Sequence, residues 1–126
     1  MNESEIKEML LNGESATLEC KRAKSEVPKS VWETYSAFAN TIGGTILLGI
    51  EENRKETDIK KRFQIIGVDD APKIVNDFWN TINSDKVNEN ILASNDVDTV
   101  KIDGVQIVCI HVPQADWRIK PIYIKG

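Results

Sequence analysis

Three glutamates have the residue type and spacing for metal-assisted chemistry: Glu14, Glu19 and Glu52. Glu14 precedes a predicted strand, Glu19 lies within it, and Glu52 follows a second, apolar strand. If the two strands are neighbours, the three carboxylates converge at one end of a sheet. Carboxylate oxygens grouped in this way bind Mg²⁺ or Mn²⁺, and the ion can activate water against a phosphodiester. Spacing alone favours three ordinary surface glutamates in a chain with 20 acidic residues, and it does not identify a nuclease.

Two basic runs flank the same strand ends. Lys21, Arg22 and Lys24 follow the first strand, and Arg54 and Lys55 follow the second. A charge run is usually a solvated face, but two runs beside one candidate site indicate a local anion-binding surface. The formal net charge of −4 argues against a protein that coats nucleic acid by charge alone, because such domains are strongly basic.

The elements expected to position these residues alternate between helix and strand. Helices are predicted at 3–11, from Pro28 to Asn40 and near 72–82, and a polar loop at 53–62. Strands are predicted at 17–21, 45–50, 63–68, 97–102, 105–112 and 122–124, with a hairpin turn at Asp103-Gly104. This order predicts a single α+β domain with a mixed sheet of about five or six strands packed with about three helices.

A structural turn is predicted between the second helix and the second strand. Gly43 and Gly44 permit left-handed backbone and close approach of a neighbouring chain. Asn40 is expected to cap the helix end or to adopt left-handed geometry itself. Gly44 and Gly49 have the glycine spacing of a phosphate-binding loop, but no Lys-Ser or Lys-Thr pair follows Gly49. This excludes an ATP site of that type.

Cysteine usage and hydropathy indicate a cytoplasmic protein without a membrane span. Cys20 and Cys109 stand in apolar strand-like runs without a Cys-x-x-Cys pair, so we interpret them as reduced core residues. His111 is the lone histidine, and its position predicts a sheet residue and not a catalytic base. No apolar run approaches the roughly 20 residues of a membrane span, and the acidic N-terminus is unlike a signal peptide.

Two motifs raise a family resemblance. They read Glu14-Ser-x-x-x-Glu19-x-Lys21 and Ser36-Ala-Phe-Ala-Asn40-Thr-x-Gly43-Gly44-Thr-x-x-x-Gly49-Ile. The chain resembles the Schlafen AlbA-like DNA-binding domain over nearly its whole length, including the final Lys120-Pro121-x-Tyr123. The resemblance implies that 1–126 is the N-terminal nucleic-acid-binding domain of a longer bacterial transcriptional regulator or helicase-related protein, with no cofactor.

The resemblance also implies roles for individual residues. In a binding module, phosphates of DNA or structured RNA would be contacted by Lys21, Arg22, Lys24, Arg54 and Lys55. In animal Schlafens the domain cleaves tRNA and rRNA with two glutamates and an aspartate. Glu14 and Glu19 match the glutamates, and Glu52 replaces the aspartate. The extra methylene moves a ligating oxygen by about 1 Å. We therefore expect a binding module and not an enzyme.

Two alternatives remain open from the sequence. One is a metal-dependent endoribonuclease in which Glu14, Glu19 and Glu52 hold Mg²⁺ or Mn²⁺. The other is a protein–protein or self-association domain, for example a homodimer. In that case apolar residues near the C-terminal end would face the partner. The candidates for that surface are Trp117, Ile119 and Ile122.

Overall fold

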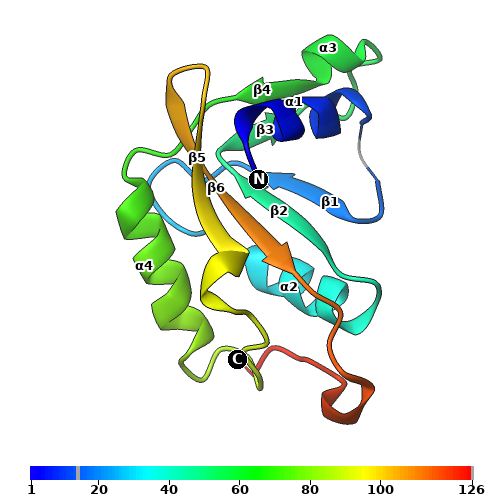
Figure 1. Cartoon of the computed structure of the whole chain (residues 1–126), viewed down its shortest axis with the longest axis vertical. Coiled ribbons are helices and arrows are strands. Elements are labelled where there is room, and N and C mark those ends of the chain that lie inside the picture. The colour runs from blue at the N-terminus through cyan, green and yellow to red at the C-terminus, as the bar shows by residue number, and fades with distance from the viewer. Residues whose placement is uncertain (14, 126) are drawn as a thin grey trace.

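The computed structural model describes residues 1–13 and 15–125 (Figure 1). The α-helices are α1 (Glu3–Leu11), α2 (Val31–Asn40), α3 (Ile59–Arg62) and α4 (Ala71–Ile82). The strands are β1 (Leu18–Lys21), β2 (Gly44–Leu48), β3 (Ile50–Glu52), β4 (Phe63–Ile65), β5 (Val97–Ile102) and β6 (Val105–Val112). Two short 3₁₀ helices are η1 (Ser94–Asp96) and η2 (Trp117–Ile119). None of the helices within the described residues is long and apolar enough to cross a membrane.

The strands form two sheets. The larger has the order β1-β2-β6-β5, with β1 parallel to β2 and the other pairs antiparallel. The smaller sheet is the antiparallel pair of β3 and β4. The predicted α+β class and its mixed sheet are therefore confirmed, and the predicted strands are divided between two sheets.

Local sequence explains where the two long N-capped helices begin. At α1, the side chain of Asn2 accepts a hydrogen bond from the Glu5 backbone, and the Glu5 side chain accepts one from the Asn2 backbone. This capping box satisfies two backbone donors at the helix start. At α4, the Asp70 side chain accepts from the Lys73 backbone, and a proline stands in the first turn, where its missing N–H is not needed.

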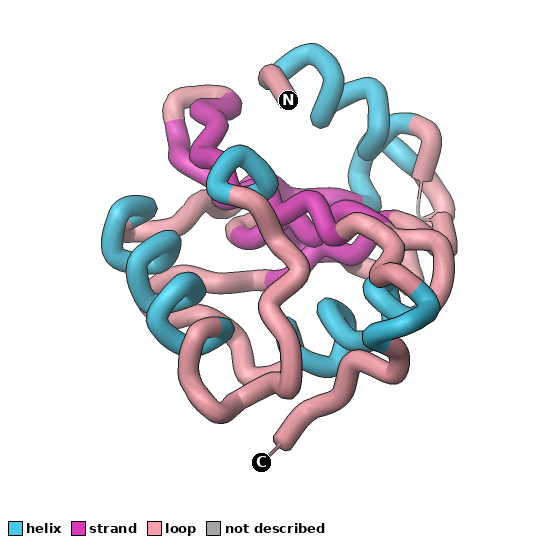
Figure 2. Tube along the Cα trace, turned by 60° about the horizontal axis from the view of Figure 1, so that its bottom comes forward, coloured by secondary structure: helices cyan, strands magenta, loops and turns pink. Residues whose placement is uncertain are grey.

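Helices cover both faces of the larger sheet. Along β6, Val108, Ile110 and Val112 face the core that includes α2 and α4. The intervening Ile107 and Cys109 face the core that includes α1. Figure 2 shows the strands between these two groups of helices. The period-two alternation of a strand thus assigns successive residues of β6 to separate cores.

The predicted strand 45–50 is broken at Gly49. Its φ is +106°, in the region that favours glycine. The Gly49 N–H donates to the Lys21 carbonyl at 2.8 Å, and its carbonyl accepts from the N–H groups of Ile66 and Gly67 at 2.9 and 2.8 Å. The chain leaves the larger sheet here and pairs with β4, so the break carries Glu52 away from the strand that Ile46 and Leu48 belong to.

The turn between α2 and β2 contains two sterically restricted glycines. Gly43 has φ +80°, and a Cβ on it would lie 2.7 Å from the Val112 carbonyl oxygen. A Cβ on Gly44 would lie 2.7 Å from the ring of Phe38. Asn40 is the last residue of α2, and its side chain binds Ile122 and does not cap the helix.

The structure also differs from the sequence-based prediction in the segments 53–62 and 122–124. The predicted loop 53–62 contains the single-turn helix α3, which begins after Asp58 because the Asp58 side chain accepts from the Lys60 backbone. The predicted strand 122–124 was wrong. Only an isolated bridge joins Ile124 to Val87 within the described residues, because side chains of Asn40 and Asn88 take the hydrogen bonds of the Pro121 carbonyl and of the Ile122 and Tyr123 N–H groups.

Candidate functional site

The candidate site lies where β1 and β3 end. On β1, Leu18 and Cys20 pack with the core beneath α1. Glu19 and Lys21 alternate with them and therefore lie on the opposite face, which α2 covers. β1 is an edge strand of the larger sheet, so these side chains are open to solvent along one side.

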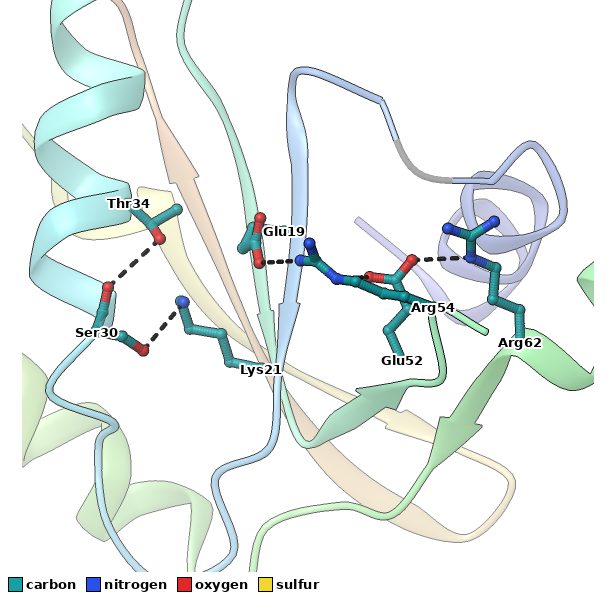
Figure 3. A network of polar contacts seen from close by, with 7 residues as sticks. All are labelled: Glu19, Lys21, Ser30, Thr34, Glu52, Arg54 and Arg62. Carbon is teal, nitrogen blue, oxygen red and sulfur yellow. Dashed lines mark hydrogen bonds and ion pairs between the residues drawn. The ribbon is translucent and has the colours of Figure 1, made fainter. Parts of the chain in front are cut away.

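Arg54 joins the two described glutamates of the predicted site. Its Nη2 lies 3.3 Å from Glu19 Oε1, and its Nε lies 3.3 Å from Glu52 Oε1. Figure 3 shows the guanidinium between the two carboxylates. Residues far apart in the sequence, on β1 and β3, thus share one cation. The third predicted carboxylate, Glu14, lies outside the described residues.

Glu52 is the most enclosed member of this group, with its side chain 5% exposed. Its Oε2 accepts a hydrogen bond from Arg62 Nε at 2.9 Å, so guanidinium groups engage both carboxylate oxygens (Figure 3). Hydrogen bonds between ionised groups are shorter and stronger than neutral ones. The pairing provides the counter-charges that a nearly buried carboxylate requires.

Arg62 is a site residue that the sequence analysis did not assign. The position of Arg62 follows from the pairing of β3 with β4, in which Glu52 lies opposite Phe63. The Asn53 N–H donates to the Arg62 carbonyl at 2.7 Å and continues this pairing. Recognising 50–52 and 63–65 as paired strands would have placed Arg62 beside the end of β3.

The arrangement of the described carboxylates does not fit a divalent metal. Residues 1–13 and 15–125 contain no group of three His, Cys, Asp or Glu side chains that could hold an ion. Mg²⁺ and Mn²⁺ take oxygen ligands, of which carboxylates are the usual ones from protein side chains, and both oxygens of Glu52 are engaged by arginines. We therefore derive no catalytic step through a metal at this position.

The predicted phosphate contacts differ in how their charge is balanced. Lys21 donates from Nζ to Ser30 Oγ at 3.1 Å (Figure 3), and no carboxylate of the described residues pairs with it. Lys55 is exposed and likewise forms no ion pair within that part of the chain. Arg22 pairs with Glu51 at 3.9 Å, and Lys24 with Asp69 at 3.7 Å. Long, exposed pairs of this kind contribute little in water.

A polar hollow of about 350 Å³ adjoins Glu52 and Arg62. Its lining is formed by Glu51, Glu52, Asn53, Lys61, Arg62 and Gln64. Lys61 forms no ion pair with any described residue. The hollow beside the Arg54 network thus has two acidic and two basic side chains in its lining, together with the amide groups of Asn53 and Gln64.

The chain belongs to the Schlafen, AlbA_2 family, whose model matches residues 14–124. A solution NMR structure of the N-terminal domain of an ATP-dependent DNA helicase RecG-related protein from Nitrosomonas europaea is similar to it. The identity is 32%, the TM-score is 0.73, and the match covers 94% of this chain and 79% of that one.

A crystal structure of a protein from Corynebacterium diphtheriae shares the fold, with 18% identity and a TM-score of 0.55. The match covers 98% of this chain but 23% of that protein. No curated protein matches the chain in sequence. The resemblance inferred from the two motifs is confirmed by the family match.

Proposed function

We propose that the chain is a nucleic-acid-binding module that contacts phosphates along the β1 edge and the adjoining segment after β3. The observation that carries the proposal is which charged side chains in this region are balanced by an opposite charge and which are not. The described carboxylates at the centre are balanced by Arg54 and Arg62. Lys21 and Lys55 have no carboxylate partner in the part of the chain that the structure describes, so their charge is available to an anion.

The same charges favour binding over cleavage. A metal-dependent nuclease needs carboxylate oxygens directed at the ion, whereas Arg54 and Arg62 engage both oxygens of Glu52. The guanidinium groups also place positive charge where a second cation would lie. A phosphate would instead be attracted by Lys21 and Lys55, whose charges no carboxylate of the described residues balances.

The family match and the similar structure support the proposal from a separate direction. The similar N-terminal domain comes from a protein related to a DNA helicase, and a nucleic-acid role for this chain is consistent with that relationship. The more specific form of the proposal is a DNA-binding module of a bacterial, cytoplasmic transcriptional regulator. That form rests on the motif resemblance.

The experiment is fluorescence anisotropy with duplex DNA and structured RNA at low salt. Non-specific binding by phosphate contacts has a Kd on the order of 10⁻⁴ to 10⁻⁶ M at physiological salt. The test variant is Lys21→Glu. Its matched control is Lys101→Glu, because Lys101 is exposed on β5, the opposite edge strand of the same sheet. Both variants change the net charge equally.

We expect Lys21→Glu to weaken binding at least several-fold and Lys101→Glu to change it much less. Equal effects would mean that only net charge matters and would remove the β1 edge from the proposal. Absence of binding at about 50 mM salt, together with a tight dimer in sedimentation, would favour the self-association alternative.

A further inference from the structure

We propose that residues 117–125, here called the C-terminal segment, form a second surface that binds the unpaired bases of single-stranded nucleic acid. This inference rests on the proposed function and specifies a class of ligand for it. The segment reads Trp-Arg-Ile-Lys-Pro-Ile-Tyr-Ile-Lys, with three cationic residues and no carboxylate, in a chain of net charge −4.

Two aromatic side chains of the segment project into solvent. Trp117 is 79% exposed and Tyr123 is 51% exposed. Large aromatic side chains normally bury most of their area, as Trp32 does at 4% exposed. Proteins that bind single-stranded nucleic acid present exposed aromatic rings among cationic side chains, because every base has a face that can stack on a ring.

The middle of the C-terminal segment, residues 121–123, is held against the rest of the domain. Ile122 is 1% exposed and anchors the segment in the α2 core. Its backbone carbonyl accepts hydrogen bonds from Ser36 Oγ and Asn40 Nδ2 at 2.7 and 2.8 Å. Asn88 Oδ1 accepts from the Tyr123 N–H at 2.7 Å, and its Nδ2 donates to the Pro121 carbonyl at 3.1 Å.

This anchoring has an energetic consequence for binding. When a ligand stacks on a segment whose backbone is already held in place, binding does not have to order that protein backbone. Less of the interaction free energy is therefore lost. Trp117 and Tyr123 are six residues apart in the sequence, and such a stretch spans at most about 20 Å. The two rings therefore lie within reach of a single strand of a few nucleotides.

The charges of the segment suit a phosphate backbone. Lys120 forms no ion pair with any described residue, and Lys125 lies 4.0 Å from Asp85 in an exposed pair. Arg118 is held by Asp116 through two contacts, of which the shorter is 2.7 Å. Lys120 and Lys125 are thus the phosphate contacts of this proposal, and the charge of Arg118 is balanced by Asp116.

Unpaired bases, and not a duplex, are the ligand that this surface selects. In a duplex the base faces are stacked on one another and cannot cover Trp117 or Tyr123. The segment offers ring faces and cations, neither of which distinguishes ribose from deoxyribose. We therefore expect oligothymidylate and oligouridylate to bind alike.

The experiment compares four ligands of equal length by anisotropy: oligothymidylate, oligouridylate, an abasic deoxyribose-phosphate strand and duplex DNA. The variants are Trp117→Ala and, as a control, Leu11→Ala. Leu11 is also an exposed apolar residue, at 55%, and lies on α1. α1 lies at the opposite end of the molecule from the C-terminal segment in Figures 1 and 2.

For the wild type we expect both single strands to bind more tightly than the abasic strand. Trp117→Ala should weaken single-strand binding by roughly tenfold and leave duplex binding unchanged. The variant should therefore bind the base-containing strands and the abasic strand with similar affinity. Leu11→Ala should change none of these. Fluorescence of Trp117 should fall on addition of oligothymidylate, since a stacked base quenches an exposed indole.

Several outcomes would overturn the inference. The abasic strand binding as tightly as oligothymidylate, or Trp117→Ala binding like the wild type, would show that bases do not contact the segment. Dissociation of a dimer by Trp117→Ala in sedimentation would assign the segment to a second copy of the chain. Duplex binding that persists in these cases leaves the proposed function intact, whereas loss of binding to all four ligands contradicts both proposals.

Discussion

The side-chain amide of Asn40 pairs with the backbone of Ile122 through two hydrogen bonds. Asn40 Nδ2 donates to the Ile122 carbonyl at 2.8 Å, and Asn40 Oδ1 accepts from the Ile122 N–H at 2.8 Å. The pair joins the end of α2 to a segment 82 residues further along the chain. One side-chain amide thus binds the Ile122 backbone as a neighbouring strand would, next to the isolated bridge between Val87 and Ile124.

Replacing Asn40 with alanine should lower the free energy of unfolding by about 1 to 3 kcal/mol, because it leaves the N–H of the buried Ile122 without its acceptor. Chemical denaturation measures the change. The matched control is Asn95→Ala, since Asn95 is exposed and its side chain forms no hydrogen bond with a described residue. The control should change stability by less than about 0.5 kcal/mol; equal effects would contradict the account.

Neighbouring glutamates at the end of β3 should respond differently to neutralisation. Glu52→Gln removes one charged carboxylate partner of Arg54 and of Arg62, at a side chain that is 5% exposed. We expect a loss of about 1 to 3 kcal/mol in the free energy of unfolding. Glu51→Gln alters a 3.9 Å pair on a side chain 46% exposed and should cost less than about 0.5 kcal/mol. A Glu52→Gln protein as stable as Glu51→Gln would show that the buried pairing contributes nothing.

The contact between Gly44 and Phe38 can be tested by a double-mutant cycle. Gly44→Ala places a Cβ 2.7 Å from the Phe38 ring, and overpacking of this kind should cost about 1 to 3 kcal/mol. Phe38→Leu removes the ring. In the double variant the Gly44→Ala cost should therefore shrink, giving a coupling energy that unfolding measurements resolve. Strictly additive costs would place the strain elsewhere.

Burial raises the pKa of the Cys109 thiol from 9.0 to about 11. The folded protein thus holds this proton more tightly than the unfolded chain does. The resulting stability is fully present below pH 9 and is lost as the pH rises through about 11. We expect the wild type to lose stability over that interval relative to Cys109→Ala, which lacks the group. A constant difference between the two proteins across the interval would contradict the raised pKa.

Local patterns predicted the larger part of the fold. The capping residues Asn2 and Asp70, the alternation of β1 and the Asp103-Gly104 turn all act within a few residues, so the sequence displays them directly. The division of the strands into two sheets was not predicted. It depends on Gly49 and on hydrogen bonds from Ile66 and Gly67, which are contacts between separated segments.

The candidate site was likewise predicted where it depends on local sequence and missed where it depends on contacts between separated segments. The strand exits indicated that Glu19 and Glu52 belong to one region, but not that Arg54 lies between them. Arg62 was missed because its position depends on the pairing of β3 with β4. The role of Asn40 was missed because its partner, Ile122, is remote in sequence.

The salt dependence of duplex DNA affinity tests the central claim most directly. If the β1 edge contacts phosphates, log K should fall linearly with log salt concentration. Lys21→Met should lower the magnitude of that slope by about one, the value for one lost phosphate contact. Lys101→Met, on the opposite edge strand, should leave it unchanged. Affinity that does not vary with salt, or a slope that both variants alter equally, would contradict the proposal that Lys21 and its neighbours form a phosphate-binding edge.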